Sequence, residues 1–156
     1  MKLIPLKQWI CDSCGEIIQK PEDGWFEWYS KKSVHSNFRI VHHRRSCMYN
    51  DQNLRKQNIL VADLELTHVI GTDGLANSLF RIELSEKGVY KIEDLKEFVE
   101  ILRRLHVPYW EEARLYWDRA FREGFHDGCD FGENTLLSII NEYGESEESA
   151  SKDEGG

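Results

Sequence analysis

The sequence predicts an α+β protein in which an N-terminal β-hairpin finger packs on a C-terminal bundle of about four helices. Two short runs of aromatic and β-branched residues near the N-terminus, separated by a polar stretch, predict the hairpin. Beyond Gly88, apolar residues recur at three- and four-residue spacing, which is typical of amphipathic helices. A Cys-x-x-Cys pair, Cys11 and Cys14, precedes the hairpin and gives the finger a candidate centre.

Three regions follow one another along the 156 residues. We expect a finger module over residues 1–58, a helical domain over 59–144 and a disordered acidic tail over 145–156. The composition, 40% hydrophobic and 31% charged, is that of a globular chain. The tail reads ESEESASKDEGG and has no large apolar side chain to bury, which predicts its disorder.

The front of the chain contains two pairs of expected strands. Trp9-Ile10 and Ile17-Ile18 flank the Cys-x-x-Cys turn in the order strand, tight turn, strand that is typical of a zinc knuckle. Residues 25–29 and 38–42 are the aromatic and β-branched runs, and the polar residues between them suit the connection of a hairpin.

The rest of the chain is mostly helical in pattern. Residues 59–70 are apolar enough to join the core, but their periodicity fits a strand and a helix equally well. In the turn that follows, Thr72 or Asp73 is placed to cap a helix. The remaining expected helices cover residues 92–105, 108–123 and 133–143.

The cysteines favour one structural zinc ion as the cofactor. A Cys-x-x-Cys turn delivers two thiolates to the same point, and a tetrahedral structural site needs two more ligands. His42 or His43, together with Cys47, follows the expected hairpin at a compatible spacing. The predicted ligands are therefore Cys11, Cys14, His43 and Cys47, and His42 is the alternative to His43.

Other roles for these side chains stay open from the sequence. Cys11 and Cys14 could instead be a redox pair or ordinary thiols, although a redox pair usually begins a helix within a βαβ pattern, which is not visible here. His35 is a further candidate ligand, and Cys129 is expected to be a free or buried thiol. The chain shows neither a signal peptide nor an apolar run of ~20 residues, so we expect a cytoplasmic protein with reduced thiols.

Residues 9–54 resemble a treble-clef or zinc-ribbon finger. In both, a knuckle and a hairpin are followed by a second ligand pair near the start of a helix. The resemblance implies that zinc is structural. The sequence departs from the usual pattern because its second pair is a histidine and a cysteine, and this leaves the class of finger open.

A weaker resemblance is to the HNH nucleases, through the doublet His42-His43 followed by Asn53-Leu54. It implies that His43 is a general base, that His42 binds a divalent metal and that Asn53 shapes the turn. The second cysteine pair and the final histidine of that family do not follow Asn53, so a degenerate, inactive relative is favoured over a nuclease.

Charge separates the front of the chain from the rear. Residues 1–60 hold ten Lys/Arg and six Asp/Glu, whereas residues 61–156 hold ten and twenty-two. Basic and aromatic residues interleave around the finger and could engage nucleic acid, or the aromatic residues could form the small core of the module. The basic residues concerned are Lys31, Lys32, Arg39, Arg44 and Arg45.

A protein partner fits the whole chain better than nucleic acid does. Residues 105–121 hold more aromatic side chains than a small helical bundle obviously requires, and these fit interface anchors and core residues equally well. There is no phosphate-binding P-loop, and a lone Cys129 beside His126-Asp127 is a weak nucleophile candidate. We therefore expect a small zinc-binding accessory or regulatory protein that binds a protein partner, and the alternatives are a nucleic-acid-binding zinc finger and a degenerate metal-dependent nuclease of the HNH type.

Overall fold

The computed structural model describes the backbone of residues 2–153 and the side chains of residues 2–144. The described chain contains seven α-helices, a short 3-10 helix and two small sheets, so the expected α+β class is confirmed. It divides into two compact units: Leu6–His106, and Met1–Pro5 together with Val107–Gly156. Among the described helices, none is both long and apolar enough to cross a bilayer.

The first sheet has the expected order of strand, tight turn and strand, and residues 9–18 are called the knuckle here. Strand β1 (Trp9–Ile10) pairs antiparallel with β2 (Ile17–Ile18), and Trp9 lies opposite Ile18. The turn between them closes through a hydrogen bond of 2.9 Å from the Gly15 amide to the Cys11 carbonyl. Gly15 has φ of 75°, a left-handed conformation that favours glycine, so the chain can reverse there.

The second sheet has four strands in the order β5-β3-β4-β6. Its centre is the expected hairpin, in which β3 (Gly24–Lys31) pairs antiparallel with β4 (Val34–His42). Strand β5 (Leu60–Glu65) pairs antiparallel with β3, and β6 (Lys91–Ile92) runs parallel to β4. The sheet thus gathers segments from well beyond the hairpin.

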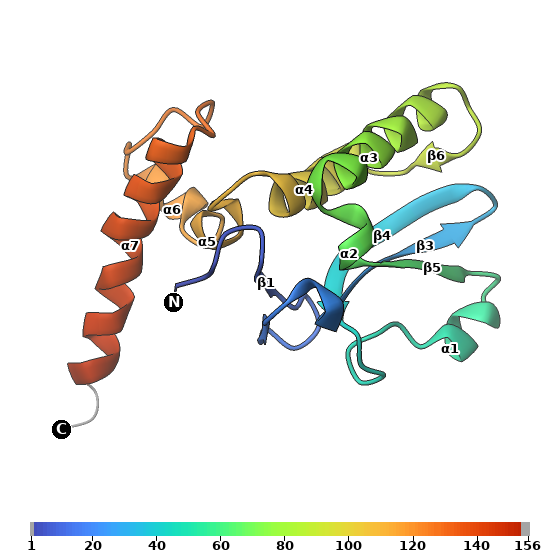
Figure 1. Cartoon of the computed structure of the whole chain (residues 1–156), viewed down its shortest axis with the longest axis horizontal. Coiled ribbons are helices and arrows are strands. Elements are labelled where there is room, and N and C mark those ends of the chain that lie inside the picture. The colour runs from blue at the N-terminus through green and yellow to red at the C-terminus, as the bar shows by residue number, and fades with distance from the viewer. Residues whose placement is uncertain (1, 154–156) are drawn as a thin grey trace. The chain divides into compact units, whose positions relative to one another are not determined.

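Alternation along β3 gives the sheet two different faces. Phe26 and Trp28 point to the main core, where their rings lie 6.0 Å and 6.3 Å from the ring of Phe38. Helices α3 (Gly71–Glu86) and α4 (Leu95–His106) lie along this side of the sheet (Figure 1). Trp25 and Glu27 point to the opposite side, where they contact the segment that follows β4.

Residues 59–70, whose periodicity was ambiguous, contain both types of element. They form β5 and then the short helix α2 (Leu66–Val69). Because β5 hydrogen-bonds to β3, the compact unit extends past the expected module boundary at residues 58/59, as far as His106. Two shorter helices complete this unit: the 3-10 helix η1 (Pro21–Asp23) and α1 (Asp51–Arg55).

The predicted cap of α3 is wrong. The helix already begins at Gly71, so its N-cap residue is Ile70, and no side chain caps it. Thr72 and Asp73 therefore lie inside the first turn, where the Asp73 carboxylate interacts favourably with the helix dipole.

The second unit contains the last three helices. The expected helix over 108–123 is two short ones, α5 (Trp110–Ala113) and α6 (Trp117–Arg122), and α7 runs over Glu133–Asp153. The backbone amide of Leu3 donates to the Glu112 carboxylate at 2.8 Å and ties the N-terminal segment to this unit. The acidic tail expected over 145–156 overlaps α7, and residues 154–156 lie outside the described residues.

Within the described residues, the helices of the expected bundle of about four are divided between two groups. Helices α2, α3 and α4 pack with the sheet of the first unit, whereas α5, α6 and α7 pack together around small clusters of their own. The reason is that the apolar face of α4, which includes Phe98 and Ile101, is used to cover the hairpin.

Candidate metal centre

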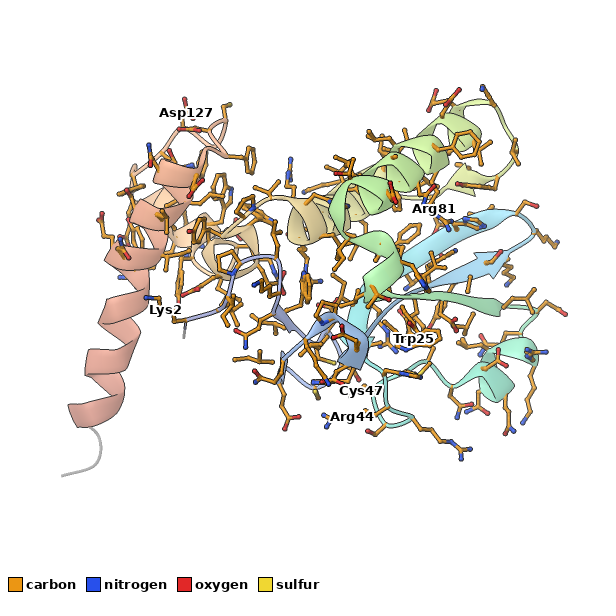
Figure 2. The ribbon with its side chains drawn as sticks, viewed as in Figure 1. Lys2, Trp25, Arg44, Cys47, Arg81 and Asp127 are labelled. Atoms are coloured by element: carbon orange, nitrogen blue, oxygen red, sulfur yellow. The ribbon has the colours of Figure 1, made fainter. Side chains whose placement is uncertain are left out.

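Four side chains converge at the end of the hairpin beside the knuckle. They are those of Cys11, Cys14, His42 and Cys47, and their ligand atoms all lie within 4.8 Å of one another. Figure 2 labels Cys47 and, next to it, Arg44 below the end of β4. The described cysteines are all free thiols, so no disulfide competes for these sulfur atoms.

Three local structures bring the four side chains together. Cys11 and Cys14 come from the knuckle turn between β1 and β2, and His42 is the last residue of β4. Cys47 lies in a tight turn after β4, in which its amide donates to the Arg44 carbonyl at 2.9 Å.

Asp12 fastens the knuckle to the hairpin. Its amide donates to the Ile40 carbonyl at 2.8 Å, and its carboxylate accepts from the Ile40 amide at 2.7 Å. Since Ile40 is two residues before His42, this double contact fixes the Cys-x-x-Cys turn against the strand that carries the histidine. These two hydrogen bonds therefore position the site without the help of a metal ion.

The structure brings His42, not His43, into the cluster. His42 Nδ1 lies 3.5 Å from Cys14 Sγ, and its Nε2 lies 3.3 Å from the Ile17 carbonyl oxygen. A histidine that donates from Nε2 to a carbonyl keeps a lone pair on Nδ1, and this is how metal-binding imidazoles are usually oriented. His43 points elsewhere: its ring lies 4.5 Å from that of Trp25, and its amide donates to the Asp23 carbonyl.

Hydrogen-bond donors surround the sulfur atoms. The Arg44 guanidinium reaches Cys47 Sγ through Nε at 3.0 Å and Cys14 Sγ through Nη2 at 3.1 Å. The His42 amide lies 3.4 Å from Cys11 Sγ. Because donors and positive charge favour thiolate over thiol, this environment suits cysteines that bind metal.

The two buried cysteines differ in their acidity. Burial raises the pKa of the Cys11 thiol, and backbone hydrogen bonds from Cys14 and His42 oppose it only in part. Burial is the largest single influence and acts to raise the pKa of Cys47, but the hydrogen bonds from Arg44 and from the side chains of Cys14, Cys11 and Ser46 together outweigh it, and the pKa is lowered. Cys47 is thus the more readily ionised of the two.

The donor set fits zinc. Three thiolates and one imidazole are a known set for tetrahedral structural zinc, and a Zn–S bond of about 2.3 Å places the sulfur atoms of such a site about 3.8 Å apart. The observed separations of at most 4.8 Å need only a small contraction to reach that geometry. Soft thiolate ligands also disfavour Mg²⁺ and Ca²⁺, which prefer oxygen.

The remaining candidate ligands lie elsewhere. His35 stacks on Tyr90, with ring centroids 4.2 Å apart, and burial lowers its pKa, so it belongs to the core. Cys129 is exposed in the loop before α7, within the second unit.

The constellation implied by the nuclease resemblance is not assembled in the described chain. His42 belongs to the cysteine cluster, and the Asn53 amide donates to the side chain of Asn50, which caps α1. The structure shows no hydrogen bond between Asn53 and either histidine within residues 2–144. Asn53 is therefore explained by the start of a helix.

Two of the basic residues singled out in the sequence have internal roles that their charge alone did not indicate. Arg44 bonds to two sulfur atoms and, through Nη2, to Glu16 at 2.7 Å. Arg39 forms an ion pair of 2.6 Å with buried Glu27 and lies over the ring of Tyr49. For Arg44, the sequence signal that could have indicated a contact with the cluster is its position three residues before Cys47.

No family model matches the chain, and neither the curated proteins nor the solved structures contain a match to it.

Proposed function

We propose that the protein is a small zinc-binding accessory or regulatory protein that acts by binding a protein partner, and that its zinc is structural. The observation that supports a structural ion best is the donor set itself. Three cysteines and one histidine fill the four positions of a tetrahedral ion, whereas a catalytic zinc keeps one position for water or substrate.

The surroundings of the four ligands favour the same role. Cys11 and Cys47 are buried, and each of the two segments that carry the sulfur atoms is held by backbone hydrogen bonds. The order of knuckle, hairpin, ligand turn and short helix α1 supports the treble-clef or zinc-ribbon type of finger. In such a finger, the ion replaces part of the hydrophobic core that a short segment cannot supply.

Apolar side chains on α3 support a protein partner. Leu75, Leu79 and Phe80 are 37%, 54% and 51% exposed, whereas the buried positions of this helix are Gly74 and Ser78. A helix whose large apolar residues face outward and whose small residues face inward is typical of a surface that another protein covers.

Most of the aromatic residues of segment 105–121, which the sequence suggested as interface anchors, lie in the core of the second unit. Trp110 and Tyr116 are buried in the clusters of the second unit, and Trp117 packs against them. Phe121 is exposed. The support for a partner therefore comes from α3 and not from residues 105–121.

Nucleic-acid binding has less support. The guanidinium groups of Arg39 and Arg44 are engaged within the fold, and the chain carries a net charge of −8. Nuclease activity would in addition need His42 as a ligand of a catalytic ion, a role that conflicts with its place in the cysteine cluster. Incubation with plasmid and Mg²⁺ or Mn²⁺ tests this alternative, and cleavage that His43→Ala abolishes would favour it.

Affinity capture with matched variants tests the protein partner. We expect one protein to be retained by the wild type and by Leu115→Glu, and to be lost with Leu79→Glu. Leu115 is a fair control because it is 44% exposed and lies in the other unit. Retention that is unchanged by Leu79→Glu would contradict a partner on α3, and retention of DNA that weakens steeply with salt would favour a nucleic-acid role.

A further inference from the structure

A second candidate site lies in the first unit, between α3 and the sheet. It is a cavity of about 380 Å³, within the range of small-molecule sites. Phe26 and Leu64, which face each other across β3 and β5, contribute to its wall, and Phe80 and Tyr90 add aromatic surface. Figure 2 shows Arg81 between α3 and the sheet, and Arg81 also lines the cavity.

The sequence of α3 explains why a cavity exists there. Gly74 and Ser78, one turn apart, are the buried residues of this helix, and both line the cavity. At Gly74 the helix passes so close to the preceding segment that an added Cβ would lie 2.2 Å from the carbonyl carbon of Val69. Gly74 therefore allows the close approach of the helix to Val69, and the small side chain of Ser78 leaves space that a larger one would fill.

Arg81 gives the cavity a positive charge without a counter-charge. Its guanidinium lies 4.8 Å from the ring centroid of Trp28, and it forms no ion pair with any described side chain. None of the residues found to line the cavity is acidic, although the chain has 28 Asp and Glu residues. Arg81 is also half-buried, where a cation without a counter-charge is costly.

The positive charge of Arg81 affects the ionisation of a neighbouring side chain. The pKa of His35 is lowered by burial and then by the positive charge of Arg81, so the neutral imidazole is favoured. Tyr90 stacks on His35 and donates its hydroxyl hydrogen to the Arg81 backbone carbonyl. The protein thus surrounds Arg81 with neutral and aromatic groups, which leave its charge available to a ligand.

We propose that this cavity binds a small organic anion, namely a carboxylate carried on an aromatic or aliphatic body. The carboxylate pairs with Arg81, and the apolar body lies against Phe26, Leu64 and Phe80. Planar guanidinium groups suit carboxylates because two parallel hydrogen bonds can form. This site is separate from the cysteine cluster, and the proposal does not depend on the role of the zinc.

Two probes that differ only in charge test the proposal. Naphthalene-1-acetate and naphthalene-1-acetamide are titrated into the zinc-loaded chain of 156 residues, and binding is followed by calorimetry and by amide chemical shifts. We expect the carboxylate to bind about tenfold more tightly than the amide, since its charge-assisted hydrogen bonds are the stronger ones. The amides of Leu64, Arg81 and Tyr90 should shift.

A variant that lacks the Arg81 guanidinium tests the same contact from the side of the protein. Arg81→Met should lower the affinity for the carboxylate about tenfold, to that of the amide, and leave amide binding unchanged. Arg55→Met is the control, because it removes the same charge from an exposed ion pair on α1. Zinc content and thermal unfolding show whether Arg81→Met keeps its fold.

The proposal would be overturned by equal affinities for the two probes, by chemical shift changes confined to residues away from the cavity, or by an Arg81→Met variant that is folded and binds the carboxylate as the wild type does. Absence of binding by both probes at 10 mM, roughly the weak end expected for small fragments, would overturn it as well. If Arg81→Met fails to fold, the comparison of the two probes on the wild type decides.

Discussion

Two adjacent histidines at the end of β4 point in different directions, and only His42 reaches the cysteine cluster. The strand ends at His42, whose Nδ1 faces Cys14 Sγ and whose Nε2 faces the Ile17 carbonyl. His43, the next residue, turns away from the cysteine cluster and places its ring against that of Trp25. A tetrahedral ion is sensitive to such a choice, since a ligand on the wrong side of the strand cannot reach it.

The histidine pair provides a matched test. We expect His42→Ala to weaken zinc binding at least about tenfold, because it removes one of four ligands, and His43→Ala to leave it unchanged. Competition with a chromogenic chelator measures the affinity of each variant. A loss only in His43→Ala would show that His43 is the ligand, and equal losses in the two variants would contradict the assignment to His42 alone.

A buried ion pair on the opposite face of the sheet gives a second test at the residue scale. Glu27 is fully buried, and its counter-charge is the Arg39 guanidinium at 2.6 Å. Arg39→Met should lower the free energy of unfolding by about 3–5 kcal/mol, because it leaves a buried carboxylate without a partner. Arg55→Met, at an exposed pair with Asp51, should change it by about 0.5 kcal/mol or less. Urea unfolding of both variants measures the difference.

The effect of Arg39→Met should depend on pH in a defined direction. Burial raises the pKa of Glu27 in the folded protein, and the Arg39 guanidinium opposes that rise. A carboxyl group with a raised folded pKa destabilises the fold at pH values above that pKa, and this penalty disappears as the group is protonated. The deficit of the variant should therefore shrink as the pH falls through the raised pKa of Glu27. A deficit that grows under acid conditions would contradict this assignment.

At the scale of single elements, the reliable predictions were those with a strong local pattern. The aromatic and β-branched runs predicted β3 and β4 because both strands are central and well covered. The Cys-x-x-Cys turn likewise predicted β1 and β2. Residues 59–70 were ambiguous because β5 is an edge strand of mixed polarity that runs directly into α2.

The four residues that cluster beside the hairpin were predicted except for the choice of histidine, which was left between His43 and His42 with His43 preferred. Spacing in the sequence places both His42 and His43 near Cys47, and nothing local separates them. The deciding contacts are long-range: the Ile17 carbonyl comes from β2, and the double contact of Asp12 with Ile40 sets the position of the strand. Pairing between distant segments of this kind is not visible in a single sequence.

Helix α3 was predicted, but its orientation was not. A periodic pattern normally places large apolar residues inward, whereas this helix buries Gly74 and Ser78. The close approach of Gly74 to Val69 explains the orientation, since only glycine allows it.

Substitution at Gly74 tests this account of the helix. Alanine in a helix interior normally stabilises by up to about 1 kcal/mol relative to glycine. Here Gly74→Ala should instead destabilise the protein by about 1–3 kcal/mol, because the new methyl group meets backbone atoms that cannot move aside. Ala76→Ser, at an exposed position of the same helix, is the control for urea unfolding. A gain in stability with Gly74→Ala would show that the close contact does not exist in solution.

At the scale of the whole molecule, the candidate metal centre is connected to the core of the first unit. Arg104 of α4 is almost fully buried, and it donates to both carboxylate oxygens of Asp12 and to the Ile10 carbonyl. The Trp9 indole donates in turn to the Arg104 carbonyl. The knuckle that carries two of the sulfur ligands is thus bonded to the helix that covers the hairpin.

Removal of zinc should therefore affect α4 as well as the knuckle. Hydrogen exchange of the full chain with and without a chelator measures this, and we expect faster exchange in β1, β2, the end of β4 and α4. Helix α7 serves as the internal reference, since none of the four ligands lies in the second unit. Unchanged exchange throughout the first unit would mean that the cluster holds no structural ion.

X-ray absorption at the zinc edge, on protein purified without chelator, tests the proposed structural Cys₃His zinc site most directly. The structure predicts one zinc per chain with three sulfur neighbours at about 2.3 Å and one nitrogen neighbour at about 2.0–2.1 Å. Absence of zinc, or a shell with oxygen neighbours and fewer than three sulfur atoms, would contradict the site and would return the two histidines to consideration as part of a catalytic centre.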